Sequence, residues 1–172
     1  WKETAALFDI NLTYNQLKLL RGRRRIDCAS ELVKLIPTEV KVNDLLCLHK
    51  PISRKLILKA QAMQGGESLI KRCHENNIPM ALVTSSSYES FQIKTAPHHW
   101  MNLFSVMVLG DDKLLAEGKP APDPYLLAAE KLNIPPKECW AVEDSISGVS
   151  SALQAGCFVF YLKEQHDELS EK

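Results

Sequence analysis

Val142-Glu143-Asp144-Ser145-Ile146-Ser147-Gly148 joins a strand pattern to a helix pattern, and this junction decides how the chain can fold. The residues before it, 139–142, form a short apolar run, and apolar residues recur at helical spacing from Ile146 onward. Two carboxylates therefore stand at the end of a strand and the start of a helix, which is where open α/β sheets bind ligands. Adjacent acids at such a place either hold a hard divalent cation, most simply Mg²⁺, or belong to an ordinary helix cap.

A second polar segment, Gly118-Lys119-Pro120-Ala121-Pro122-Asp123, precedes another helix pattern. Because prolines fix φ and lack an N–H, this segment is stiff and cannot lie inside a helix or a central strand. Lys119 therefore has a fixed anchor point for its ammonium group; the alternative is a solvated loop lysine. We expect Asp123 to cap a helix over 124–132 and Pro124 to take its first position.

A third polar segment follows an apolar run of strand length, Ile78-Pro79-Met80-Ala81-Leu82-Val83. The next four residues are Thr84, Ser85, Ser86 and Ser87, and a helix pattern begins beyond them. Hydroxyls and free backbone N–H groups at a strand's carboxyl end, ahead of a helix, form a site for an anion. The alternative is that these residues only cap the helix.

Helices and strands alternate through the second half of the chain, which predicts an α/β fold with a parallel sheet. Residues 1–62 are helix-rich instead, and Gln64-Gly65-Gly66 is the expected hinge between the two parts. We therefore divide the chain into a helical domain, 1–62, and an α/β core, 63–172. In the α/β core we expect helices near 68–76, 88–95, 124–132 and 146–154. The expected strands of this core are 78–83, 104–109, 139–143 and 157–161.

The order Val-Thr-Ser-Ser (83–86), Gly-Lys-Pro-Ala-Pro-Asp (118–123) and Val-Glu-Asp-Ser-x-x-Gly (142–148) resembles motifs two, three and four of the haloacid dehalogenase superfamily. Within it, the chain is most similar to hydrolases of the β-phosphoglucomutase and phosphoglycolate phosphatase type. The resemblance implies a Rossmann-like core with a small helical cap domain. It also implies an Mg²⁺-dependent phosphatase or phosphomutase whose partner is a small phosphorylated metabolite, such as a sugar phosphate or phosphoglycolate.

The resemblance assigns roles to individual residues. Thr84 would hydrogen-bond the transferring phosphoryl group, and Lys119 would neutralise charge on that group and on the attacking carboxylate. Asp144 would bind Mg²⁺, with Glu143 in support. These assignments agree with the chemistry, since phosphoryl transfer is catalysed mainly by positioning and charge stabilisation.

The resemblance also implies substrate contacts, from Ser85 and Ser86 beside Thr84 and from a loop at 21–27 that is similar to the family's substrate-specificity loop. In that loop Gly22 and Arg25 would contact the substrate.

An arginine cluster occupies the same loop, and such a run could instead form a nucleic-acid patch. The chain has 21 Lys+Arg against 21 Asp+Glu, and this balance argues against a dedicated nucleic-acid binder. We therefore expect Arg25 to face a substrate phosphate; the alternative is a solvated helix end.

The family's nucleophile is the first aspartate of an Asp-x-Asp motif on the first strand, and here the chain departs from the pattern. Its similar segment, Asp9-Ile10-Asn11-Leu12-Thr13, has an amide in place of the second acid, and an amide cannot act as general acid and base. The apolar residues around it also follow helical spacing. We therefore expect residues 1–8 to form the first cap helix, Thr13 to cap the next helix, and the chain to begin after the catalytic strand.

A chain without this motif is either a fragment of an ordinary enzyme or a non-catalytic pseudoenzyme that binds phosphorylated metabolites. We favour the fragment, because Thr84, Lys119 and Asp144 are all present and a decayed site would lose some of them. In both cases we expect the chain as given to have little hydrolase activity.

Composition sets the remaining expectations. The 172 residues include five cysteines, an odd number without a Cys-x-x-Cys pair, which fits a reducing compartment. No apolar run approaches the roughly 20 residues of a membrane span, and the start of the chain shows no signal-peptide pattern. We therefore expect a cytoplasmic monomer that binds neither membranes nor nucleic acid.

Overall fold

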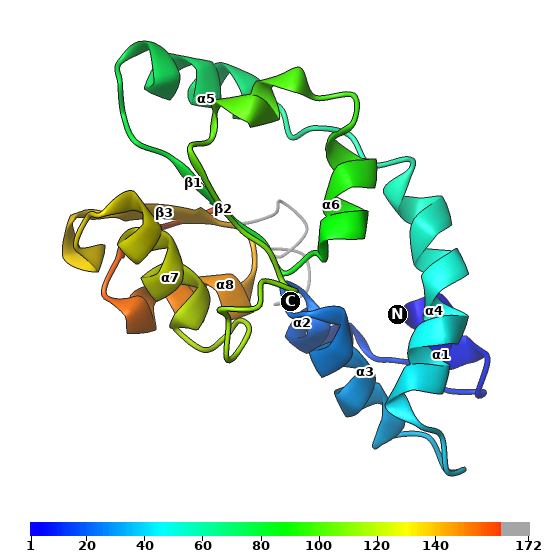
Figure 1. The fold of residues 1–172 in the computed structure, drawn as a ribbon. Helices are drawn as coiled ribbons and strands as arrows, with labels where there is room; N and C mark the ends of the chain where they lie inside the picture. The colour runs from blue at the N-terminus through cyan, green and yellow to red at the C-terminus, as the bar shows by residue number, and fades with distance from the viewer. Residues whose placement is uncertain (163–172) are drawn as a thin grey trace, which may run out of the picture.

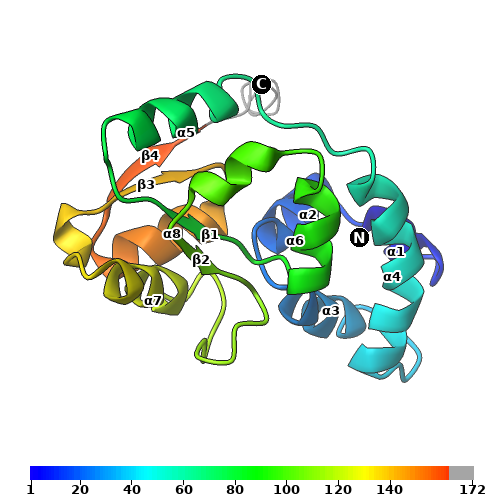
Figure 2. The same cartoon turned by 45° about the horizontal axis from the view of Figure 1, so that its top comes forward.

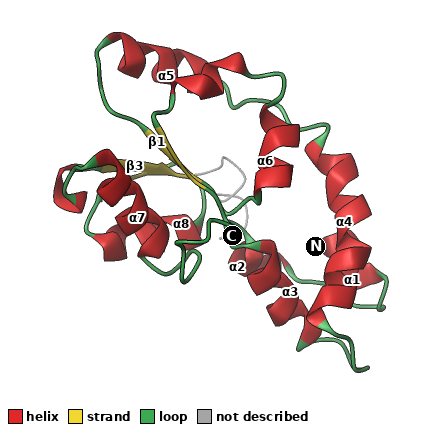
Figure 3. Ribbon diagram, viewed as in Figure 1, coloured by secondary structure: helices red, strands yellow, loops and turns green. Residues whose placement is uncertain are grey.

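The structure is a computed structural model that describes residues 1–162. Its helical end is made of four helices, and its other end combines parallel strands with helices, as Figure 1 and the secondary-structure colours of Figure 3 show. The last ten residues of the predicted core, 163–172, lie outside the described residues. The helical end comprises α1 (Lys2–Ala6), α2 (Tyr14–Leu20), α3 (Arg25–Val33) and α4 (Val42–Ile57).

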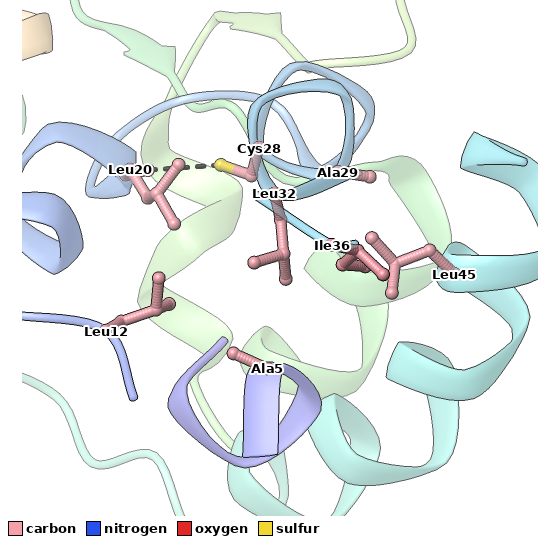
Figure 4. Close-up of a cluster of buried hydrophobic side chains, with 8 residues drawn as sticks. All are labelled: Ala5, Leu12, Leu20, Cys28, Ala29, Leu32, Ile36 and Leu45. Atoms are coloured by element: carbon pink, nitrogen blue, oxygen red, sulfur yellow. Dashed lines mark hydrogen bonds between the residues drawn. The ribbon is translucent and has the colours of Figure 1, made fainter. Parts of the chain in front are cut away.

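Small and aliphatic side chains from these four helices and their loops form one buried cluster (Figure 4). Leu32 of α3 and Leu45 of α4 are almost fully buried in it, and each such leucine stabilises the folded state by about 1.5–3 kcal/mol through burial. The thiol of Cys28 donates a hydrogen bond of 3.2 Å to the Leu20 carbonyl, which ties α3 to the end of α2. The complete cluster is Ala5, Leu12, Leu20, Cys28, Ala29, Leu32, Ile36 and Leu45.

Thr13 begins α2 as predicted. Its hydroxyl accepts a hydrogen bond from the Gln16 backbone N–H, and the Gln16 side chain accepts one from the Thr13 backbone N–H. This reciprocal capping box satisfies two N–H groups that a helix start would otherwise leave without partners. Residues 2–6 form α1, within the stretch 1–8 that was expected to be helical.

The strands pair in parallel, which confirms the predicted fold class. β1 (Ala81–Val83) pairs with β2 (Val106–Val108), and β3 (Trp140–Glu143) pairs with β4 (Phe158–Tyr161). Among residues 1–162 these are two separate hydrogen-bonded pairs rather than one continuous sheet. Alternating helix and strand patterns predict parallel order, but they carry no information on which strand edges meet.

Helices lie on both sides of the strands. In Figures 1 and 2, α7 (Asp123–Leu132) and α8 (Ile146–Ala155) lie on one side, and α5 (Gly66–Glu75) lies on the other. The buried cluster of this end combines Tyr125 of α7 with small residues of β3, α8 and the turn before β4, and these small residues let α8 approach the strands closely. The remaining elements are α6 (Tyr88–Thr95) and the 3₁₀ segments η1 (His99–Leu103) and η2 (Pro136–Glu138).

Several predicted boundaries shift by one to three residues. The strand expected at 78–83 begins at Ala81, because Pro79 cannot donate a ladder hydrogen bond. The prediction that Asp123 caps its helix is wrong: Pro122 is the cap, and Asp123 is the first helical residue. Its carboxylate instead accepts a hydrogen bond of 3.2 Å from the Glu117 N–H.

The apolar run before Glu143 is buried on one face only. Ala141 and Glu143 are buried, whereas Trp140 and Val142 are 73% and 51% exposed. Alternate residues of a strand point to opposite faces, and α8 together with Tyr125 of α7 packs on the face that carries Ala141 and Glu143. Within residues 1–162, no helix combines the length and apolarity needed to cross a bilayer.

Candidate active site

A cavity of about 600 Å³ lies between the helical end and the carboxyl ends of β1 and β3. The hydroxyl of Thr84, the ammonium of Lys119 and the carboxylate of Asp144 all belong to residues that line it, although they are far apart in the sequence. β1 and β3 belong to separate parallel pairs, and the residues that follow their carboxyl ends, Thr84 and Asp144, both line this cavity. Gly22, Arg25, Ser85, Ser86 and Glu143 line the same cavity.

Lys119 is held by the core rather than left free in a loop. It is 5% exposed, and its ammonium donates a hydrogen bond of 3.1 Å to the Val83 carbonyl and pairs with the Glu143 carboxylate. The Tyr125 hydroxyl donates to the same oxygen of Glu143. Burial and the Glu143 charge raise the pKa of Tyr125 far above its ordinary value, so this hydroxyl stays a donor. Val83 and Glu143 therefore fix the position of one buried cation, and Tyr125 fixes the carboxylate that pairs with it.

The other oxygen of Glu143 faces the start of α8. The Ser145 hydroxyl lies 3.3 Å from it and accepts a hydrogen bond of 3.1 Å from the Gly148 N–H as the helix cap. A Cβ at Gly148 would lie 1.9 Å from this oxygen, so only glycine allows the helix to approach the carboxylate so closely. The helix start also places partial positive charge beside Glu143.

Asp144 is the more accessible of the two acids. Its side chain is 58% exposed and accepts a hydrogen bond of 3.0 Å from Arg21. Mg²⁺ is often held by one or two carboxylates together with water and substrate oxygens, and Asp144 fits this requirement. Both oxygens of Glu143 are already engaged, so Glu143 fits the supporting role. In the described part of the chain no group of three or more His, Cys, Asp or Glu side chains gathers, and the metal roles of both acids stay predictions.

Thr84 and Ser85, the first two hydroxyl-bearing residues after β1, make different contacts. Thr84 receives a hydrogen bond of 3.2 Å from the Ser86 N–H on its hydroxyl, which keeps that hydroxyl at the cavity wall. Ser85 instead donates a hydrogen bond of 2.6 Å to the Gly22 carbonyl. Ser85 therefore holds the loop from the helical end in place, and its predicted contact with substrate is not tested.

Gly22 allows this loop to press against the core. Its φ is +79°, and a Cβ there would lie 2.2 Å from the Ser145 hydroxyl. From the other side, the Ser147 hydroxyl donates a hydrogen bond of 2.7 Å to the Arg21 carbonyl. The hydroxyls of Ser85 and Ser147 thus donate to the carbonyls of two consecutive loop residues, Gly22 and Arg21. These hydrogen bonds hold the loop against the core, where it forms one wall of the cavity.

Alternate residues of the arginine cluster point in different directions, toward the cavity and away from it. Arg21, Arg23 and Arg25 line the cavity, whereas Arg24 makes two hydrogen bonds to Asp27 at 2.8 and 3.2 Å. Arg25 donates to the Ser87 hydroxyl at 2.8 Å, and the buried Nε of Arg23 has no acceptor within residues 1–162. Three of the four arginines of the cluster therefore line the cavity. Their positions agree with the prediction that Arg25 contacts a substrate phosphate.

Sequence reasoning missed His49, which is 5% exposed on α4 and also lines the cavity. Its ring stacks on Trp1 with centroids 3.7 Å apart and shares a hydrogen bond of 2.8 Å with the Thr4 hydroxyl. Burial, followed by the positive charges of the amino terminus and Arg25, lowers the pKa of His49 to about 4. Helical spacing places it on the apolar face of α4, where a histidine gives no separate signal.

Tyr125 and Lys94 were also missed. Both lie on expected helices, but the Tyr125 hydroxyl reaches Glu143 on β3, and the Lys94 ammonium folds back to Ser86, just before its own helix. For Lys94 the sequence did contain a signal, a polar stripe along α6. The stripe is formed at intervals of three and four residues by Ser87, Ser90 and Lys94.

Asp9 lies away from the cavity. It is an exposed residue with a φ of +58°, in the turn after α1, and it is not among the cavity-lining residues. Within residues 1–162, the carboxylates that line the cavity are those of Glu143 and Asp144. The segment 9–13 therefore does not supply the cavity with a third acid.

The sequence profile described as haloacid dehalogenase-like hydrolase matches residues 3–156. A probable pseudouridine-5'-phosphatase from Drosophila melanogaster is 43% identical over 105 residues, which are 59% of this chain and 46% of the relative. A (DL)-glycerol-3-phosphatase 2 from Arabidopsis thaliana is 30% identical over 97% of this chain and 72% of its own length.

Among solved structures, a β-phosphoglucomutase from Clostridium difficile superimposes with a TM-score of 0.81. The match covers 99% of this chain and 78% of that one at 18% identity, which establishes the shared fold. The matched region spans about half the length of the Drosophila relative, 46%, and 35% of a bifunctional riboflavin kinase/FMN phosphatase from Arabidopsis thaliana.

Proposed function

The chain belongs to the haloacid dehalogenase-like hydrolase family, and from this premise we propose that it forms the phosphoryl-binding site of an Mg²⁺-dependent phosphatase or phosphomutase. The substrate is a small phosphorylated metabolite. The observation that carries the proposal is the convergence of Thr84, Lys119 and Asp144 on one cavity at the carboxyl ends of β1 and β3.

The three groups have complementary tasks toward a phosphoryl group. The Thr84 hydroxyl donates a hydrogen bond to a phosphoryl oxygen, and the fixed ammonium of Lys119 compensates its negative charge. Because Glu143 and Tyr125 hold Lys119 in place before substrate arrives, little reorganisation is needed when charge develops. Asp144 would hold Mg²⁺, which supplies further charge neutralisation when bound.

The relatives support the substrate class. Their names specify phosphatases acting on a phosphorylated nucleoside, on glycerol 3-phosphate and, in Escherichia coli, on hexitol phosphates. These compounds share a phosphate ester on a small polyhydroxylated carbon skeleton. A cavity of about 600 Å³ has room for such a molecule.

A second candidate function is phosphometabolite binding with little turnover by the chain as given. The position of Asp9 outside the cavity favours it, because Glu143 is committed to Lys119 and Asp144 to Arg21. Neither acid is then free to attack phosphorus. On this proposal the 172 residues bind the substrate but hydrolyse it slowly.

Calorimetric titration with glycerol 3-phosphate tests the shared part of both candidates. We expect Thr84→Val to weaken binding about tenfold, since it removes one hydrogen bond to a charged group without disturbing the buried Lys119 pair. Lys119→Met is expected to abolish binding, and Lys137→Met, an exposed lysine outside the cavity, serves as the charge-matched control. A flat titration of the unchanged chain, or unchanged affinity in Thr84→Val, contradicts the proposal.

Turnover separates the two candidates. Release of p-nitrophenol from p-nitrophenyl phosphate, measured with and without Mg²⁺, reports hydrolysis directly. Mg²⁺-dependent release by the unchanged chain that is lost in Lys119→Met identifies the phosphatase. Binding without release identifies the binding function.

A further inference from the structure

The β3–β4 pair has one apolar face that the rest of the described structure leaves exposed. Along β3 the buried residues Ala141 and Glu143 alternate with the exposed residues Trp140 and Val142, so the exposed pair points away from α8. The parallel register places each exposed residue of β3 beside an exposed residue of β4, on the same side of the strand pair. We call this side the aromatic face, and it consists of Trp140, Val142, Phe158, Phe160 and Leu162.

The rings of the aromatic face are open to solvent. Trp140 is 73% exposed, Phe158 64% and Phe160 51%. The Trp140 and Phe160 rings contact each other diagonally across the two strands, with centroids 5.4 Å apart and planes 57° apart. On the other face α8 packs against both strands, and α5, which lies on the exposed side in Figures 1 and 2, packs against η1 instead. Within residues 1–162 the aromatic face is therefore without a partner.

The area of this face is larger than that of scattered surface residues. A fully buried aromatic side chain removes about 150–250 Å² from solvent, so the exposed fractions of the three rings offer roughly 300–450 Å². With Val142 and Leu162 the face reaches about 400–600 Å², the range of the largest and often functional patch on a monomer. Two such faces in contact would bury about 800–1,200 Å², which is enough for a weak, reversible protein–protein interface.

The chemistry of the aromatic face favours a second copy of this chain as its partner. Its five side chains carry no charge, so nothing in the face repels an identical face that a two-fold axis brings against it. The whole chain has 21 Lys+Arg and 21 Asp+Glu, so two copies approach each other without net repulsion. Sheet faces also stack on each other at about 10 Å in β-sandwiches, with interdigitating side chains, and this packing suits a flat strand pair.

We propose that two copies of this chain associate through the aromatic face, with the β3–β4 pair of one copy stacked on that of the other. This pairing differs from the monomer expected from the sequence. The buried area sets a weak dimer, with a dissociation constant on the order of 1–100 μM. The inference is independent of the proposed function, because Trp140, Phe158 and Phe160 do not line the cavity.

Sedimentation velocity at chain concentrations from about 1 to 200 μM tests this inference, because the range brackets the expected dissociation constant. The unchanged chain should shift from monomer to dimer across it. Trp140→Lys and Phe158→Lys should each weaken the association at least about 10-fold, since each places an unpaired charge in an apolar contact. Val142 is left unchanged because it also lines the cavity.

Leu153→Lys is the matched control. Leu153 is 58% exposed on α8, which packs on the opposite face of the strands, so the same apolar-to-lysine change there should alter the dissociation constant by less than about twofold. Far-UV circular dichroism confirms that each variant is folded, and either lysine variant suffices if the other does not fold. A chain that stays monomeric throughout, an unchanged dissociation constant in a folded lysine variant, or equal weakening by Leu153→Lys overturns the inference.

Acrylamide quenching of Trp140 fluorescence identifies what covers the face. The Trp140 signal is the difference between the unchanged chain and Trp140→Phe, which removes the contribution of the other two tryptophans. We expect Trp140 to be readily quenched at low chain concentration and to become shielded as the dimer forms. If Trp140 is already shielded in the monomer, another part of the same chain covers the face, and the inference is overturned. If the chain dimerises while Trp140 stays equally accessible, the copies meet through a different surface, and the inference is again overturned.

Discussion

Replacement of Gly148 by alanine tests whether the Glu143 carboxylate is fixed as tightly as its contacts indicate. The added methyl group would lie 1.9 Å from one oxygen and 2.1 Å from the carboxyl carbon of Glu143. Both separations are far inside the roughly 3.5 Å of a normal contact. Because Gly148 sits in the first turn of α8, the backbone cannot easily yield, and the carboxylate must move.

The cost follows from what that movement breaks. Glu143 is 6% exposed and contacts Lys119, Tyr125 and Ser145, so any displacement weakens hydrogen bonds to a buried charge. Losing one such bond costs about 1.5–3 kcal/mol, and overpacking adds about 1–3 kcal/mol. The better helix propensity of alanine offsets about 1 kcal/mol. We expect Gly148→Ala to lower the free energy of unfolding by about 1.5–5 kcal/mol.

Urea unfolding followed by circular dichroism measures this change. Gly66→Ala is the matched control, because Gly66 also lies in the first turn of a helix, α5, and a Cβ there meets nothing within 4 Å. It should be neutral or stabilise the fold by up to about 1 kcal/mol. If Gly148→Ala unfolds within about 0.5 kcal/mol of the unchanged protein, the carboxylate is not held as described.

Three further predictions follow from local structure. Thr13→Ala removes the side-chain half of a capping box and should lower the free energy of unfolding by about 1 kcal/mol in urea titrations; no loss would mean that α2 does not depend on its cap. Because the folded pKa of His49 is about 4 against an ordinary 6.5, the unfolded chain binds more protons between these values. Stability should therefore fall as pH drops from about 6.5 to about 4, and His49→Gln, unlike the exposed control His99→Gln, should flatten that part of the curve. Burial raises the pKa of Cys28 to about 11, so iodoacetamide should label the exposed Cys47 well before Cys28, as peptide mass mapping would show; equal labelling rates would contradict the buried position of Cys28.

The sequence was sufficient for the parts of the site that depend on backbone chemistry. Pro120 and Pro122 predict a stiff loop that carries Lys119, and the apolar run ending at Val83 predicts a strand that ends in hydroxyls. The structure has Thr84 directly after β1 and Lys119 in the loop before α7, and both residues line the cavity. The cap expected at Asp123 is wrong by a single position, because Pro122 and Asp123 both fit a helix start.

The choice of partners could not be predicted in this way. The supporting metal role of Glu143 stays a prediction, and nothing in the sequence indicates that its oxygens contact Lys119, Tyr125 and Ser145. Lys94 belongs to a polar stripe that is visible in the sequence, but the position of Arg25 near it, on another helix, is not. Partner choice depends on how α3, α6 and α7 pack, and no short stretch of sequence contains that packing.

By itself, the sequence determined the α/β class, the order of helices and strands, and three polar segments, from which residues line one cavity in the structure. The tertiary structure alone decided which charges are neutralised and which are left exposed to a ligand. The reason is physical: φ, capping and apolar periodicity act over a few residues, whereas the balance of charge in a cavity depends on side chains brought together from distant parts of the chain.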